Sequence, residues 1–266
     1  MDSQPQLSIV MVSFNQAQFL EEAIVSVLNQ DYPNIEFIMM DGGSTDGSVD
    51  IVERYRDKFS YCNIGPDGGA PAALNAGFAQ ATSNYFAYLN SDDVLLPHAV
   101  STWMETFAKN GADIVYGDIA IIDHEGNPST LPERRVTVFK ATPFSLRRMA
   151  AGGCTIPQQA SAWTRHTHEV TGGFVEINGS SWDGEYYVDA AIAGLRFQHI
   201  PQVLAQFRVH NDSISGTGKF ENIRKVDHAR MRAKWREAGF DLSPIEKFLL
   251  VKTGQSIRAW RYLTGS

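Results

Sequence analysis

IEFIMMDGGSTDGS, residues 35–48, changes character at a single position. A run of apolar residues ends at Asp41, and two glycines, two hydroxyl side chains, Asp46 and Gly47 follow. An ordinary turn needs about two such residues. The apolar run predicts a buried strand, and the excess of small and polar residues after it indicates that the end of this strand holds a ligand.

Strand and helix patterns alternate on both sides of this stretch. Residues 7–15 (LSIVMVSFN) open with a buried strand, and residues 16–30 carry an apolar helical stripe for which Asn15 is the expected N-cap. Further along, the pattern predicts a helix over 45–59, a helix through Leu74 and Phe78, a strand at 85–89 and a helix opening at Pro97. Such alternation predicts an α/β fold with a parallel, doubly wound sheet that binds ligands at the carboxyl ends of its strands.

The second half of the chain is less regular. Residues 112–123 and 197–210 each have the pattern of a strand pair, residues 125–135 that of a turn or excursion, and residues 136–153 that of a strand leading into a short helix. There is no internal repeat and no low-complexity linker. A single domain with two lobes is the most economical interpretation.

Composition narrows the class of protein. The 266 residues are 43% hydrophobic and 20% charged, which is typical of a globular domain, and no apolar stretch approaches the roughly 20 residues that span a bilayer. We therefore expect a soluble, unsecreted protein of the cytoplasm. The two cysteines, Cys62 and Cys154, lie far apart, so they indicate neither a disulfide framework nor a zinc site.

Charge divides the chain into two parts. Residues 216–266 contain 11 Lys and Arg against five Asp and Glu, whereas residues 1–215 contain 12 against 25. An acidic body repels phosphate backbones, which argues against nucleic acid as a partner.

A second acidic loop follows another apolar strand, in YFAYLNSDD (residues 85–93). Asp92 and Asp93 are adjacent there, and the repulsion between their carboxylates is best offset by a hard cation such as Mg²⁺ or Mn²⁺, which in turn bridges phosphate oxygens. The alternative is that these residues cap the next helix, and capping would then be the whole role of Asp93.

Residues 8–52 (SIVMVSFNQAQFLEEAIVSVLNQDYPNIEFIMMDGGSTDGSVDIV) and 66–93 (PDGGAPAALNAGFAQATSNYFAYLNSDD) resemble glycosyltransferase family 2. The resemblance covers roughly residues 7–210. It implies the GT-A fold, a Rossmann-like, mostly parallel central sheet flanked by helices, here with a C-terminal helical tail. It divides the chain into a catalytic domain (1–215, with a nucleotide-sugar-binding half at 1–95 and an acceptor half at 96–215) and a basic helical tail (216–266).

The same resemblance assigns roles on the donor side. Asp41 matches the residue that contacts the donor base, usually uracil, although a tight turn closed by its own aspartate explains it equally well. Residues 90–92 (NSD) occupy the position of the family's DXD motif, which implies that Asn90 meets the ribose and Asp92 the metal, with Asn90 a departure that removes a charge. The remaining donor-side matches are Ser13, Asn15, Asp67, Ser91, Gln158 and Gln159 as donor contacts, and His210 and Asp93 as metal ligands.

The acceptor side resembles the family less closely. Residues 172–194 (GGFVEINGSSWDGEYYVDAAIAG) place Asp183 at the family's catalytic aspartate, which takes the proton from the acceptor hydroxyl, and Glu185 two residues later. A helix cap is the simpler role for Asp183. Trp182 stands where glutamate is frequent and Asp189 where a basic residue is frequent.

The resemblance implies an inverting glycosyltransferase that uses a nucleotide-diphosphate sugar, with UDP the expected nucleotide, a Mn²⁺ or Mg²⁺ cofactor, and a saccharide or lipid-linked acceptor in polysaccharide or glycolipid synthesis. The alternative is an inactive nucleotide-sugar-binding or scaffold protein, favoured by the departures at Asn90, Trp182 and Asp189. The basic tail fits an amphipathic helix on an anionic membrane at its cytoplasmic face, or a helix packed on the catalytic domain.

Overall fold

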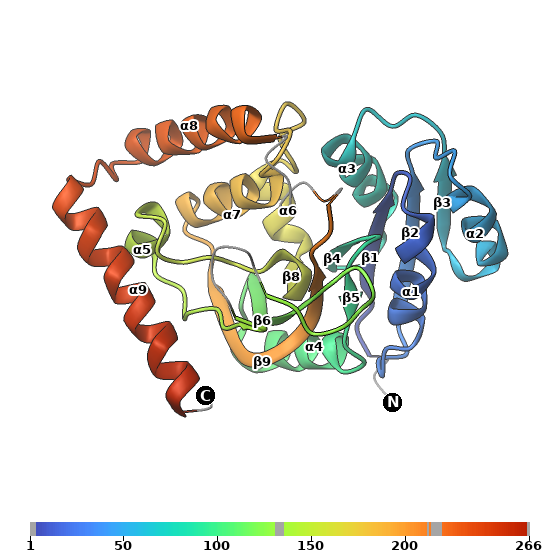
Figure 1. The fold of residues 1–266 in the computed structure, drawn as a ribbon, viewed down its shortest axis with the longest axis horizontal. Helices are drawn as coiled ribbons and strands as arrows, with labels where there is room; N and C mark the ends of the chain where they lie inside the picture. The colour runs from blue at the N-terminus through green and yellow to red at the C-terminus, as the bar shows by residue number, and fades with distance from the viewer. Residues whose placement is uncertain (1–3, 131–135, 212, 214–219, 265–266) are drawn as a thin grey trace.

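The computed structural model describes residues 4–130, 136–211, 213 and 220–264. Figure 1 shows one mixed α/β body with a curled sheet flanked by helices and two long helices at its left and upper edges. The expectation for residues 125–135 falls partly outside the described residues. Within them, a turn is closed by the Asp123 N–H, which donates to the Asn127 carbonyl, and by the Asn127 N–H, which donates to Oδ1 of Asp123.

Within these residues, nine strands form one sheet in the order β3-β2-β1-β4-β8-β6-β9-β5, with β7 paired to β6. The strands are β1 (Leu7–Ser13), β2 (Ile35–Asp41), β3 (Tyr61–Ile64), β4 (Tyr85–Asn90), β5 (Val94–Leu95), β6 (Ile114–Ile122), β7 (Val138–Phe139), β8 (Ser161–Thr164) and β9 (Phe197–Arg208). Strands β3, β2, β1 and β4 run parallel, as the alternating pattern predicts.

The helices connect and cover these strands. They are α1 (Ala17–Leu28), α2 (Ser48–Arg54), α3 (Ala70–Gln80), α4 (Ala99–Asn110), α5 (Leu146–Ala150), α6 (Arg165–Thr171), α7 (Trp182–Ile192), α8 (Glu221–Glu237) and α9 (Pro244–Thr264), with short 3₁₀ turns at Arg56–Lys58 and Gln158–Ala160. The helix predicted over 45–59 is therefore shorter, and the helix predicted at Pro97 starts at Ala99.

Two expected strand pairs are single strands. Residues 112–123 contain the single strand β6 and residues 197–210 the single strand β9, and the two strands pair in parallel with register shifts around Asp118. Gly117 explains the irregularity, because a Cβ there would lie 2.7 Å from the Leu204 side chain and 2.8 Å from the Gln202 carbonyl. The two backbones thus approach closely at a bulge instead of turning.

The apolar core lies between sheet and helices. All seven residues of β1 are buried, together with the inner stripe of α1. This arrangement brings the carboxyl ends of β1, β2 and β4, where the polar stretches of the sequence occur, to one edge of the sheet.

The C-terminal helices pack on elements of the second half of the chain. Helix α8 lies along α7 and α9 along α5 (Figure 1). Arg261 of α9 reaches the interior, where its guanidinium pairs with the Asp118 carboxylate at 2.8 Å. The inner faces of the tail are thus packed against the domain, as the second alternative for the tail expects.

Candidate active site

The loop after β2 is closed by the carboxylate at its start. Asp41 is fully buried, and its Oδ1 accepts hydrogen bonds from the backbone N–H groups of Gly43 (3.1 Å) and Ser44 (2.8 Å), while Oδ2 accepts one from the Ser44 hydroxyl at 2.8 Å. Gly42 is the residue of this loop that lines the cavity described below. The structure gives Asp41 the turn-closing role; a contact with a donor base stays a prediction.

Gly42 lies between two side chains that face the same cavity. A Cβ on Gly42 would be 3.2 Å from the Asp67 carboxylate and 3.2 Å from the Phe14 ring. Phe14 is 61% exposed, and Asp67 is fixed by a 2.9 Å hydrogen bond that its Oδ1 accepts from the Gly69 N–H. An aromatic face, a carboxylate and an uncovered backbone therefore meet at one end of the cavity.

Ser13 and Asn15, two residues of the SFN stretch at the end of β1, differ in their position relative to the cavity. Ser13 lines the cavity, and within the described residues its buried hydroxyl has no hydrogen-bond partner; the same holds for Oε1 of Gln16. Asn15 does not line the cavity, and it does not cap α1, because Gln16 is the N-cap. Its backbone has φ +53°, and its Oδ1 accepts a hydrogen bond from the Thr45 N–H, so it ties the β1 end to the β2 loop.

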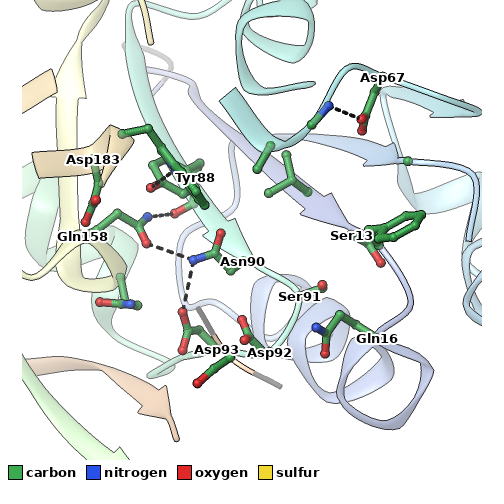
Figure 2. A pocket seen from close by; sticks show the side chains of 18 of the residues that line it. Ser13, Gln16, Asp67, Tyr88, Asn90, Ser91, Asp92, Asp93, Gln158 and Asp183 are labelled. Atoms are coloured by element: carbon green, nitrogen blue, oxygen red, sulfur yellow. Dashed lines mark hydrogen bonds between the residues drawn. The ribbon is translucent and has the colours of Figure 1, made fainter. Parts of the chain in front are cut away.

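The end of β4 and the loop after it contribute four residues to the cavity, namely Asn90, Ser91, Asp92 and Asp93 (Figure 2). Asp93 is 1% exposed, and its Oδ1 accepts a 3.0 Å hydrogen bond from the Arg208 N–H. Burial and then the charge of Asp92 raise the pKa of Asp93 well above its ordinary value. Asn90 lies between Asp93 and Gln158, with its Nδ2 3.5 Å from an oxygen of each.

Asp92 and His210 are the pair best suited to hold a cation. The Asp92 carboxylate faces the cavity, and its Oδ2 lies 3.2 Å from Nε2 of the buried His210. A carboxylate oxygen is a ligand that suits Mg²⁺ and Mn²⁺, and the histidine imidazole is the commonest protein ligand of metal ions. In the described part of the chain, no group of three or more His, Cys, Asp or Glu residues is placed to hold a metal ion.

Gln158 and Gln159 both line the cavity beside this loop. Gln158 donates a hydrogen bond from Nε2 to the Tyr88 carbonyl at 2.8 Å. A side-chain hydrogen bond from Gln159 to Asp93 favours the ionised carboxyl and opposes the effect of burial.

Helix α7 supplies the opposite wall. Asp183 and Trp182 lie at its first turn and line the cavity, with the indole N–H donating a 3.1 Å hydrogen bond to the Tyr88 hydroxyl. Burial raises the pKa of Asp183, against the smaller effect of hydrogen bonds from its own N–H and that of Gly184. A carboxylate with a raised pKa at the rim of a cavity is suited to act as a general base.

Glu185 is placed differently from Asp183. It is fully buried outside the cavity and accepts hydrogen bonds from Arg230 and Lys234 of α8. Burial opposes its ionisation, but the hydrogen bonds from Arg230, Lys234 and Asn178 outweigh this effect and lower its pKa to about 2. The geometry thus gives Glu185 a role in holding α8; a part in catalysis stays a prediction.

These elements enclose a cavity of about 570 Å³, a size typical of small-molecule sites. The Ser180–Asp183 side faces the β1–β4 strand ends across it. Several lining residues were not singled out as site residues from the sequence, among them Phe14, Gln16, Tyr88 and Ser180. Phe14 could have been found, because it is a large apolar residue among polar neighbours at a strand end; the others have no local signal.

Curated relatives carry the name glycosyltransferase. The chain is 29% identical over 212 residues to an uncharacterized glycosyltransferase of Nostoc sp., an alignment that covers 77% of this chain and 65% of that protein. It is 35% identical over 130 residues to one from Haemophilus influenzae, covering 46% and 50%. For one from Mycobacterium tuberculosis, the identity is 30% over 200 residues, covering 72% and 71%. The chain thus spans half to about two thirds of the first two relatives.

Solved structures share the fold. S. aureus TarS in complex with UDP-GlcNAc superposes with a TM-score of 0.69 at 17% identity, over 92% of this chain and 70% of that one. The mannosyltransferase PcManGT of Pyrobaculum calidifontis, in complex with GDP-Man and Mn²⁺, gives 0.64 at 18% identity, over 100% and 77%. These likenesses confirm the expected GT-A fold.

The family itself follows from the sequence profile that matches. The profile described as Glycosyl transferase family 2 covers residues 8–170, which is more than half of the chain and includes the carboxyl ends of β1, β2 and β4. This chain belongs to glycosyl transferase family 2.

Proposed function

We propose that the protein is an inverting glycosyltransferase that moves a sugar from a nucleotide-diphosphate donor to an acceptor hydroxyl. UDP is the first nucleotide to test. The observation that carries the proposal is that Asp92 and Asp183, from opposite halves of the fold, open onto one cavity. The donors named for the neighbours, UDP-GlcNAc and GDP-Man, support a nucleotide-sugar donor but differ in base and sugar.

Asp183 is the proposed base. Its ionised carboxylate takes the proton of the acceptor hydroxyl as the oxygen bonds to the anomeric carbon, and the bond from that carbon to the diphosphate oxygen breaks on the opposite face. The proton ends on Asp183 and the electron pair on the leaving diphosphate. Burial raises the pKa of Asp183 and makes it a stronger base than an exposed carboxylate.

Asp92 and His210 are the proposed holders of Mn²⁺ or Mg²⁺, with Asp93 held beside them by the Arg208 N–H. A bound cation would offset the negative charge that develops on the diphosphate. On the donor side, the exposed Phe14 ring and the Asp67 carboxylate next to Gly42 offer an aromatic face and an acceptor to a base. Ser13, Asn90 and Gln159 complete the proposed donor contacts.

We also propose that the acceptor is a saccharide or a lipid-linked sugar of a polysaccharide or glycolipid pathway, and that the C-terminal helices contact a membrane peripherally. Within the described residues, no helix combines the length and apolarity needed to cross a bilayer. Exposed apolar side chains on α9, among them Phe248 (60%) and Leu263 (86%), support contact with a surface.

A transfer assay with a panel of nucleotide sugars tests the proposal. We expect nucleotide release that depends on an acceptor and on Mn²⁺, a loss of about two to four orders of magnitude in kcat for Asp183→Asn, and a similar loss for Asp92→Asn or with EDTA. Asp50→Asn, an exposed carboxylate on α2, is the matched control. Donor binding without turnover in the unaltered protein would instead support the scaffold alternative.

A further inference from the structure

Two buried polar side chains lie behind one wall of the cavity. The wall consists of Ser180, Trp182 and Asp183, and we call it the acceptor wall because it faces the donor-side strand ends. Behind it are Asn178 and Asp227, each 1% exposed. Buried amides and carboxylates persist only where their hydrogen bonds are satisfied, so the partners of these residues reveal what they hold.

Both residues hold the backbone of the acceptor wall. Oδ1 of Asn178 accepts hydrogen bonds from the N–H groups of Ser180 (3.2 Å) and Ser181 (2.7 Å). Oδ2 of Asp227, on α8, accepts hydrogen bonds from the Ser180 N–H at 3.1 Å and from its hydroxyl at 2.8 Å. The segment that leads into the first turn of α7 is thus fixed from two sides.

Arg230 joins these two contacts. The Nε of Arg230 lies 2.9 and 3.0 Å from the two carboxylate oxygens of Glu185. Its Nη2 donates one hydrogen bond to Glu185 at 2.6 Å and another to Asp227 at 3.0 Å. Glu185 in turn accepts a 2.8 Å hydrogen bond from Asn178. A planar guanidinium satisfies two carboxylates at fixed angles, which a lysine cannot reproduce.

We propose that Arg230 is a positioning residue for transfer, which fixes the acceptor wall, and with it Asp183, through Glu185, Asn178 and Asp227. This inference rests on the proposed function of Asp183. Lys234 completes the cluster: its Nζ lies 2.9 Å from Glu185 and 2.6 Å from Asp189, so α8 supplies a cation to both carboxylates. Helix α8 is thereby part of the catalytic unit.

The two halves of the site should respond differently when Arg230 is changed. Phe14, Gly42 and Asp67 come from the β1–β3 end of the sheet, whereas α8 lies over α7 at the other side of the molecule (Figure 1). Displacing a reacting group by about 1 Å can cost about 100-fold in rate. Loss of Arg230 should therefore lower kcat and leave the donor Kd unchanged.

The experiment compares Arg230→Met with Arg232→Met, which removes an exposed cation from the same helix, and with Arg230→Lys. We expect kcat for Arg230→Met to fall about 10- to 100-fold, with the donor Kd from calorimetry within about twofold of the unaltered protein. Arg232→Met should match the unaltered protein, and Arg230→Lys should recover part of the rate. A kcat for Arg230→Met equal to that of Arg232→Met, or a parallel loss of donor binding, would overturn the proposal.

Amide hydrogen exchange gives a readout that needs no activity. The N–H groups of Ser180 and Ser181 should exchange about tenfold faster or more in Arg230→Met than in Arg232→Met. Equal exchange would also overturn the proposal, whereas an unaltered protein inactive with every donor would count against the proposed function alone. If Arg230→Met does not fold, the double variant Glu185→Gln/Arg230→Met, which also neutralises one of the two buried carboxylates that Arg230 pairs with, takes its place in each comparison.

Discussion

At the scale of single residues, four buried or partly buried carboxylates are assigned different roles by their neighbours. The Asp41 carboxylate accepts three hydrogen bonds from its own loop, and the Glu185 carboxylate pairs with two cations of α8. Asp93 is buried against Asp92, and its pKa is raised. Asp183 combines a raised pKa with a place in the cavity wall, so the residue that suits proton transfer is distinguished by its environment and not by its type.

Glu185 should make the stability of the protein sensitive to acid. Its pKa of about 2 lies below the ordinary 4.5, so its contribution is complete above pH 4.5 and is lost as the pH falls from about 4.5 toward 2. Between pH 7 and pH 3 this loss amounts to about 2 kcal/mol. Urea unfolding at pH 7 and at pH 3 measures this loss. Between the two pH values, the free energy of unfolding should fall by about 2 kcal/mol more in the unaltered protein than in Glu185→Gln.

The control for this measurement is Glu125→Gln, an exposed carboxylate in a surface turn, which should retain the full acid sensitivity. Identical pH dependence in Glu185→Gln and the unaltered protein would show that the ion cluster with α8 contributes nothing to folding stability. Such a result would leave the hydrogen bonds of Asn178 to the wall in place, since its Oδ1 contacts do not involve Glu185.

Sequence could predict where polar residues gather but not what each one contacts. The acidic strand ends at Asp41 and Asp92 are local features, visible as a break in an apolar run. Arg230, a partner of Glu185 on α8, is 45 residues away, and Arg208 reaches the Asp92 carbonyl across 116 residues. Contacts at such separation depend on how the helices pack, which no local pattern contains.

At the scale of elements, the regular first half was predictable because each strand and helix there has its own apolar period. Strands β6 and β9 were not, because their irregularity comes from each other: the missing side chain of Gly117 admits Leu204. A local break in pattern at such a position looks the same as a turn. The long strands instead continue the sheet and carry Arg208 to the site.

Helix α3 shows a similar close approach that can be tested. A Cβ on Gly77 would lie 2.6 Å from a Val10 methyl group and 3.2 Å from Met40, so α3 rests directly on β1 and β2. We expect Gly77→Ala to destabilise the fold by about 1–3 kcal/mol despite the better helix propensity of alanine. The free energy of unfolding in urea measures this effect.

Gly184→Ala is the matched comparison, because it also places alanine in a helix but meets only the Met231 sulfur, at 3.8 Å. It should leave stability unchanged or raise it by up to about 1 kcal/mol. Equal effects of the two substitutions would mean that α3 can move away from the sheet at little cost, and that the loop from Asp67 to Ala70 is less firmly placed than the geometry indicates.

At the scale of the whole molecule, charge and apolar exposure are both concentrated in the C-terminal helices. Of the fourteen large apolar side chains that the described residues expose, eight lie on α8 and α9. On α9, Ile245, Leu249 and Leu263 share one side, since their spacing is close to whole helical turns. The inner side of the same helix is fastened by Arg261, so the outer side cannot turn inward.

An anionic bilayer fits this outer side. The 216–266 segment has a positive balance of Lys and Arg whereas the body is acidic, so a negatively charged surface would attract the helices and repel the rest. We expect the protein to co-sediment with vesicles that contain phosphatidylglycerol, more weakly with phosphatidylcholine alone, and less as salt is raised. Ile245→Ser/Phe248→Ser/Leu249→Ser should weaken binding about tenfold or more, because three large apolar side chains no longer enter the interface.

The control is Ile177→Ser, which alters a side chain that is 79% exposed outside α8 and α9. It should bind vesicles as the unaltered protein does, and all variants should keep transfer activity on a water-soluble acceptor, because the cavity lies on the other side of α7. Undiminished sedimentation of the triple variant would exclude the outer side of α9 as the contact. If vesicle binding and transfer activity were lost together, the apolar side chains of α9 would instead support the fold. Helix α9 is fastened to β6 through Arg261 and Asp118, and β6 pairs with β9, which carries Arg208.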